Sequence, residues 1–172
     1  MTSLGVAAYS RSVEQPNLMT LAVKKLLIHA GAHSELPVST PSDHQLNISV
    51  IATSLDATAA ALKKAGALAS RLGARISLTV PQVVPFPLPL ESPPVLVEFN
   101  ENRYRAIASE NPVETSVHIY LCRDRLEVLR SVLKPRSLVV LGGPKRWWPT
   151  PERRLARKLR QSGHEVILIE TE

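Results

Sequence analysis

Residues 46–80 read LNISVIATSLDATAAALKKAGALASRLGARISLTV, which places two short β-branched runs on either side of an alanine-rich segment. The runs at 46–52 and 75–80 have the length and composition of buried strands. Between them, small and aliphatic residues recur at helical spacing, with Ser54 in place to cap the helix and Gly73 to end it. The stretch therefore predicts a strand–helix–strand unit whose helix lies very close to a sheet.

The remainder of the chain continues this alternation of strands and helices. Further strands are predicted at 113–121, 137–143 and 164–170, and further helices at about 95–109, at 124–133 and from Thr150 and Pro151 to near Gly163. Strands that alternate with helices predict a parallel sheet with helices on both faces, joined by right-handed crossovers. In such sheets a ligand binds beyond the carboxyl ends of the strands, where the strand order reverses.

Two segments depart from this pattern. Residues 1–45 predict an N-terminal extension, partly ordered, with one candidate helix at about 17–30, and the domain itself spans 46–172. The segment PQVVPFPLPLESPP (81–94) carries six prolines, which exclude a regular helix or a central strand. It is either an ordinary connecting loop or an extended ligand for a partner domain.

Composition sets the broad class of the protein. The chain has 172 residues, the size of one domain, with 44% hydrophobic residues and a net charge of +6. Its single cysteine, Cys122, excludes an intrachain disulfide and a cysteine metal cluster, and it favours a reducing compartment. The opening MTSLGVAAYS lacks a basic n-region, and no apolar stretch is long enough to span a bilayer. We therefore predict a cytoplasmic protein without a membrane span.

Two stretches of the chain resemble the universal stress protein family. The stretch ISVIATSLDATAAALKKAGALASRLGARISLTV (48–80) is similar to that family's first strand, alanine-rich helix ending in L-G-A, and second strand. LKPRSLVVLGG (133–143), with the following helix and HEVILIE (164–170), is similar to its fourth strand, last helix and last strand. The resemblance covers roughly 46–170. It implies a Rossmann-like α/β fold with a five-stranded parallel sheet of order 3-2-1-4-5 and helices on both faces.

The resemblance also implies a stress-response or regulatory role and, commonly, a homodimer formed through the last strand. An apolar edge strand favours pairing with a second chain. The predicted dimer edge consists of Val166, Ile167, Leu168 and Ile169.

One branch of the family binds ATP with the motif G-x-x-G-x9-G-[S/T] after the fourth strand. The corresponding residues here read GGPKRWWPTPERRLARKL. Gly142 matches the first glycine, Lys145 stands where the second is expected, and Glu152 and Arg153 fall about where Gly-Ser would open the helix. A proline and two tryptophans cannot rebuild a cradle of backbone amides for phosphates. We therefore predict a non-enzymatic binding domain that does not bind ATP in the usual manner and has no cofactor.

A divergent nucleotide or anion site, with ATP or AMP as ligand and at most weak hydrolysis, stays open as an alternative. The acidic residue that the family places after its first strand is replaced here by Thr53 or Ser54. Adenine would lie near Thr53 and the backbone around Val80. The phosphates would lie near Gly142, Gly143, Lys145, Arg146, Arg153 and Arg154.

The segment from Lys145 to Arg160 holds seven basic residues, one acid and two tryptophans. Arg153 and Arg154 lie in the first turn of the predicted helix, where the helix dipole disfavours cations unless an anion docks there. A simpler interpretation is a solvated basic face, with Trp147 and Trp148 capping the sheet edge. Such a strip also suits nucleic acid, but no nucleic-acid-binding signature appears, so we do not expect that partner.

The sequence predicts no catalytic residue and no metal site. The five histidines are dispersed, and His29 and His33, which could share a helical face, lack a third ligand. A third class of function therefore stays open beside the two above: a module that only docks another protein through its sheet and its proline-rich loop.

Overall fold

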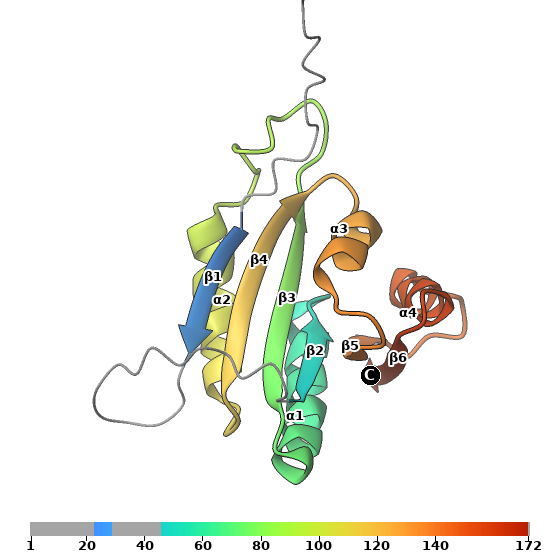
Figure 1. Ribbon diagram of the computed structural model, residues 1–172. Helices are drawn as coiled ribbons and strands as arrows, with labels where there is room; N and C mark the ends of the chain where they lie inside the picture. The colour runs from blue at the N-terminus through green and yellow to red at the C-terminus, as the bar shows by residue number, and fades with distance from the viewer. Residues whose placement is uncertain (1–22, 29–45, 172) are drawn as a thin grey trace, which may run out of the picture.

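The computed structural model describes residues 23–28 and 46–171, which form one sheet with helices on both of its faces (Figure 1). None of the helices in these two ranges is long and apolar enough to cross a membrane. The elements, in chain order, are β1 (Val23–Ile28), β2 (Asn47–Ile51), α1 (Leu55–Leu72), β3 (Arg75–Val83), α2 (Val97–Ser109), β4 (Thr115–Cys122), α3 (Arg125–Val132), β5 (Leu138–Pro144), α4 (Pro151–Gln161) and β6 (Glu165–Thr171).

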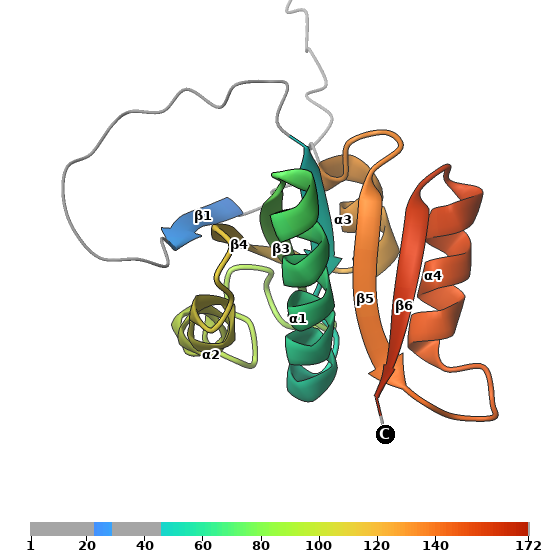
Figure 2. The same ribbon diagram turned by 90° about the horizontal axis from the view of Figure 1, so that it is seen from below.

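The strand order is β1-β4-β3-β2-β5-β6, and the strands from β2 to β6 are all parallel to their neighbours. Counted from β2, the five parallel strands have the order 3-2-1-4-5, so the predicted fold class is confirmed. Helices α1 and α2 cover one face of the sheet, while α3 and α4 cover the other (Figure 2). The strand order reverses between β2 and β5, which places the candidate ligand site at the carboxyl ends of these two strands.

The helix predicted at 17–30 is wrong over residues 23–28, which form the strand β1. This strand lies antiparallel to β4, with Val23 opposite Tyr120 and Ile28 opposite Thr115. The outer edge of β4 offers backbone N–H and C=O groups to a further strand, and pairing with them overrides a local preference for helix. The other residues of the predicted extension, His29 and His33 among them, lie outside the described ranges.

β3 runs three residues beyond its predicted end at 80, so the proline-rich segment does not exclude a strand over 81–83. Thr79 faces β2, because its carbonyl oxygen accepts a hydrogen bond from the Ala52 N–H at 2.9 Å. Backbone groups alternate along a strand, so Pro81 faces the same side, where β2 has already ended. Its missing N–H therefore leaves no ladder bond unmade.

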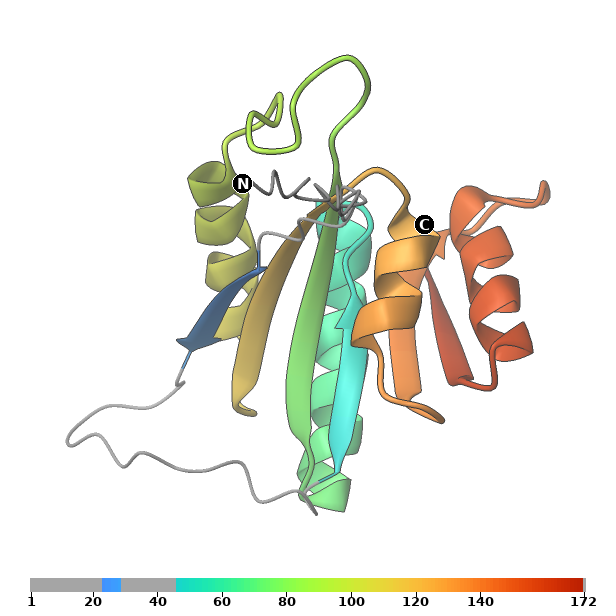
Figure 3. The same ribbon diagram turned by 45° about the horizontal axis from the view of Figure 1, so that its top comes forward.

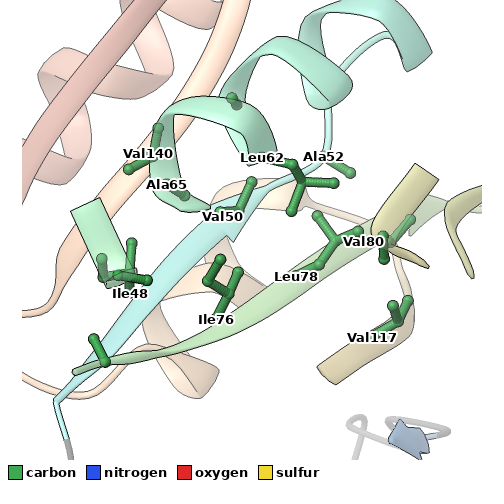
Figure 4. Close-up of a cluster of buried hydrophobic side chains, with 14 of the residues drawn as sticks. Ile48, Val50, Ala52, Leu62, Ala65, Ile76, Leu78, Val80, Val117 and Val140 are labelled. Carbon is green, nitrogen blue, oxygen red and sulfur yellow. The ribbon is translucent and has the colours of Figure 1, made fainter. Parts of the chain in front are cut away.

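The larger core lies between the sheet and α1 (Figure 4). Val50 on β2 and Leu78 on β3 are fully buried there, against small residues of α1 such as Ala61 and Ala65. Alanines on the buried face let the helix axis approach the sheet closely, as the sequence predicted. A second core, which includes Leu129 and Leu159, lies beneath α3 and α4 on the opposite face.

Leu78→Ala tests this core. Because Leu78 is 0% exposed, we expect the substitution to lower the free energy of unfolding by about 2–5 kcal/mol in urea titrations. Leu72→Ala is the matched control, since Leu72 is 51% exposed at the end of α1, and its effect should stay within about 1 kcal/mol. Equal losses for both variants would contradict the assigned burial.

Candidate functional site

The point where the strand order reverses is bridged by a hydrogen bond between β2 and β5. Just beyond β2, the Thr53 hydroxyl donates to the carbonyl oxygen of Gly142 on β5 at 2.9 Å. Two of the predicted site residues, 89 positions apart in the chain, therefore meet here. The bond also occupies the Thr53 hydroxyl with a contact inside the protein.

The turn from β2 into α1 is held by a set of hydroxyl contacts. Ser54 caps the helix, and its Oγ accepts a hydrogen bond from the Ala57 N–H at 3.4 Å. Thr58, which is fully buried, donates from its hydroxyl to the Ser54 carbonyl at 2.6 Å. The same hydroxyl accepts from the Thr53 N–H at 3.0 Å. Thr53 and Ser54 thus start a helix in this structure, and the part that Thr58 plays was not predicted.

Gly142 lies directly beneath the first turn of α1. A Cβ added to Gly142 would stand 2.0 Å from the carbonyl oxygen of Ala57. A glycine is therefore needed here for the helix to pack this close to β5. Close packing of α1 against β5 therefore explains the glycine at position 142 without a bound ligand.

Gly143 lies beneath Glu152 of α4. A Cβ on Gly143 would be 2.8 Å from the Cβ of Glu152 and 3.1 Å from its Cγ. The Oε2 atom of Glu152 is buried and accepts no hydrogen bond from the residues that the structure describes. Gly142 and Gly143 stand in register with Ile169 and Glu170 of β6, so both lie within a paired strand and not in an open loop.

Arg153 lies in the first turn of α4, where it forms an ion pair with β6. Thr150 caps this helix by accepting from the Arg153 N–H at 3.3 Å, and Pro151 occupies its first turn. The Arg153 guanidinium donates to Oε1 of Glu170 at 2.5 Å, which ties the helix to the end of β6. An ion pair with Glu170 therefore explains a cation in this turn without a bound anion.

Between β5 and α4, residues 145–149 form a loop that leaves the sheet. The Lys145 N–H donates to the Thr171 carbonyl at 2.7 Å, after which the chain turns outward. Lys145, Arg146 and, further on, Arg154 are exposed. Trp147 is 88% exposed and Trp148 is 74% exposed, so the tryptophans do not cap the sheet edge as one interpretation had it.

The side chain of Val80 does not point toward the predicted ligand site but into the larger core. The residue is opposite Ile119 in the β3–β4 ladder, and its side chain is 4% exposed within the larger core. Figure 4 shows Val80 beside Leu78 and Val117. Its side chain therefore serves packing.

Cys122 ends β4 and is buried, with its thiol 3.8 Å from the Gln82 carbonyl oxygen. Burial raises the pKa of the Cys122 thiol, and the nearby Arg125 opposes this only in part. A raised pKa keeps the thiol protonated at neutral pH, and a protonated thiol is a poor nucleophile. The residue behaves as a small core side chain.

The remainder of the proline-rich segment forms a loop held by Arg123. The guanidinium donates to the carbonyl oxygens of Val84 and Leu88, each at 2.7 Å, and lies 4.2 Å from the ring centre of Phe86. Phe86 nevertheless remains 80% exposed. The loop is thus anchored while it presents an aromatic ring to the surface.

Among solved structures, a universal stress protein in complex with cAMP is similar to the chain, with 20% sequence identity and a TM-score of 0.40 over 74% of this chain and 98% of that one. No family model matches the chain, and no curated protein matches it. The cAMP is a ligand of that other protein. The fold assignment rests on the strand order found here.

The site therefore contains some of the residues predicted from the sequence and further residues that were not predicted. Thr53, Ser54, Gly142 and Gly143 come together where the strand order reverses. Ala57, Glu152 and Glu170 complete the arrangement, and none of the three was predicted as a site residue. Helical spacing could have placed Ala57 one turn after the cap, but only the fold brings Glu170 to Arg153.

Gly142→Ala and Gly143→Ala form a pair of variants that tests the packing of the two glycines. The added methyl group at 142 meets a backbone carbonyl, whereas at 143 it meets a side chain that can shift. We expect Gly142→Ala to lower the free energy of unfolding by about 1–3 kcal/mol or more, and Gly143→Ala to lower it by less. Urea unfolding measures both, and a neutral Gly142→Ala would show that α1 does not lie this close to β5.

Proposed function

We propose that this protein is a non-enzymatic cytoplasmic binding domain of the universal-stress-protein type, with a stress-response or regulatory role, that does not bind ATP in that family's usual manner. One observation carries the proposal. The Ala57 carbonyl oxygen and the Glu152 side chain occupy the spaces beside Gly142 and Gly143.

A phosphate site of the glycine-loop kind needs backbone N–H groups that point at the ligand and room for the ligand to approach them. Here the two glycines belong to the paired part of β5, in register with Ile169 and Glu170. A phosphate beside Gly143 would also lie against the Glu152 carboxylate, and like charges at short range repel. Both the steric and the electrostatic argument support a domain without the family's triphosphate site.

The absence of catalysis is part of the same proposal. Cys122, which could act as a nucleophile elsewhere, has a raised pKa caused by burial and is inaccessible within the core. Arg153, which could stabilise a developing negative charge, pairs with Glu170. Both groups serve the fold in the described arrangement.

The two alternative functions that the sequence left open, an anion site and a docking module, are not equally supported by the structure. A divergent anion site would have to rely on Lys145, Arg146 and Arg154, which are exposed, because Arg153 is already paired. Docking of another macromolecule is favoured by a specific observation: Phe86 is held by Arg123 and is still 80% exposed. Larger exposed apolar patches mark interaction sites, and Phe86 shares the connection between β3 and α2 with the exposed Leu88, Val95 and Leu96.

A nucleotide titration followed by thermal unfolding tests the proposal. A ligand that binds only the native state at a hundred times its dissociation constant stabilises it by about 2.7 kcal/mol. We expect ATP, AMP and cAMP at millimolar concentration to leave the melting temperature unchanged. A saturable rise that disappears in Lys145→Ala/Arg146→Ala/Arg154→Ala would establish the anion-site alternative, and a rise that persists in that variant would refute the proposal in favour of a site that does not depend on these cations.

We also propose that the protein is a homodimer paired through β6. Among the described strands, β6 lies at one end of the sheet, and its apolar residues Ile167, Leu168 and Ile169 are only partly buried by their own chain. An unprotected apolar edge supports pairing with a second copy.

Substitution of Leu168 tests this edge. An antiparallel pair centred on β6 would place Leu168→Lys near its symmetry mate, and like charges directly opposite one another destabilise a strand pair. We expect the wild type and Leu168→Val to sediment as dimers and Leu168→Lys to sediment as a monomer with native far-UV circular dichroism. A monomeric wild type would refute the proposed dimer.

A further inference from the structure

We propose that the loop of residues 145–149, called the tryptophan loop below, docks this domain on the surface of an anionic phospholipid bilayer. The inference rests on the proposed function in one respect: the domain acts through binding and not through chemistry. It goes beyond that function by naming the surface and the chemistry of the partner.

The first observation is the exposure of the two indole rings. Trp147 is 88% exposed and Trp148 is 74% exposed, so both rings project into solvent. Their centres are 6.2 Å apart. Indole rings gather at the boundary between lipid headgroups and acyl chains, where an apolar body and a polar N–H are both accommodated. A projecting pair can enter that boundary without any rearrangement of the sheet.

The second observation is the charge around the rings. The exposed cations of the tryptophan loop and of the first two turns of α4 are Lys145, Arg146, Arg154 and Arg157. The acid of this segment, Glu152, is half-buried above Gly143, and Glu170 is already paired with Arg153. The surface next to the indoles is therefore cationic. Anionic headgroups attract such a surface, and each basic residue near the membrane strengthens binding.

The third observation is where the loop lies in the fold. β3 and β5 run parallel to β2, so the loops that follow them leave the same edge of the sheet, as Figure 3 shows. The loop after β3 carries Phe86 and Leu96, which are 80% and 69% exposed. The exposed side chains Leu46 and Leu72 lie at the opposite edge. The carboxyl edge thus presents two separate apolar projections on one side of the domain.

Single-stranded nucleic acid is the other polyanion that basic residues and aromatic rings can bind. Such binding uses a charged groove along the backbone and rings on which successive bases stack. The planes of Trp147 and Trp148 are inclined by 48°, and both rings project outward, so they do not form one stacking platform. The geometry favours insertion into a bilayer interface.

The chain carries its own probe for this proposal, because Trp147 and Trp148 are its only tryptophans. The intrinsic tryptophan fluorescence of the full chain therefore reports on this loop alone. We expect a saturable shift of the emission to shorter wavelength when vesicles of phosphatidylserine and phosphatidylcholine are added at 0.15 M salt. Vesicles of pure phosphatidylcholine should produce at most a small shift, since the cations then lack a partner.

Three variants separate the contributions. Lys145→Glu/Arg146→Glu keeps both indoles, and its vesicle affinity should fall by at least about 25-fold, because each cation contributes about fivefold. Trp147→Ala/Trp148→Ala, followed by vesicle sedimentation, should lose binding by tenfold or more. Leu46→Ala/Leu72→Ala is the matched control, since it removes two exposed apolar side chains from the opposite edge and should bind vesicles like the wild type.

The outcomes separate this inference from the proposed function. Unchanged emission with phosphatidylserine vesicles overturns the membrane inference and leaves the nucleotide titration untouched. Emission that is quenched by oligo-dT, with no response to vesicles, overturns it in favour of nucleic acid. Equal loss of vesicle binding in the Leu46→Ala/Leu72→Ala control also overturns it, because binding would then not depend on the tryptophan loop.

Discussion

The fold depends on the close approach of α1 to β5 at Gly142. The carbonyl oxygen of Ala57 occupies the space that any side chain at position 142 would need. This contact fixes the helix over the junction of β2 and β5, and the hydrogen bond from Thr53 to Gly142 fastens the same junction from the other strand. At this junction, where doubly wound sheets often bind a ligand, the described residues pack against and hydrogen-bond to one another.

The same constraint gives both glycines a role in packing that requires no bound phosphate. Gly142 admits α1 on one face of the sheet, and Gly143 admits the side chain of Glu152 on the other. Glycine allows close approach, but it does not determine what approaches. In this chain the approaching groups are a helix backbone and a carboxylate, and Arg153 is drawn to Glu170. The exposed aromatic side chains of this region are those of the tryptophan loop and Phe86.

Local features of the fold could be predicted from the sequence because they depend on neighbouring residues. Ser54 caps α1, Thr150 and Pro151 start α4, and Gly73 ends α1 with a positive φ of 62°, each as its residue type requires. Non-local features could not be predicted. β1 forms because the outer edge of β4 can pair with a further strand. Pro81 is tolerated because β2 has ended before the position that Pro81 would face. Arg153 can bond to Glu170 only once β6 has taken its place in the sheet. The exposure of Trp147 and Trp148 depends on the path of their loop, which composition does not encode.

In this account the backbone at Gly142 and Gly143 contacts only other parts of the protein and binds no nucleotide. An amide-resolved NMR titration of the full chain with ATP tests it most directly, because it observes these two N–H groups themselves. We expect the Gly142 and Gly143 amide resonances to stay in place at millimolar ATP. Saturable movement of both resonances, together with those of Ala57 and Glu152, would show that nucleotide displaces this packing and would contradict the account.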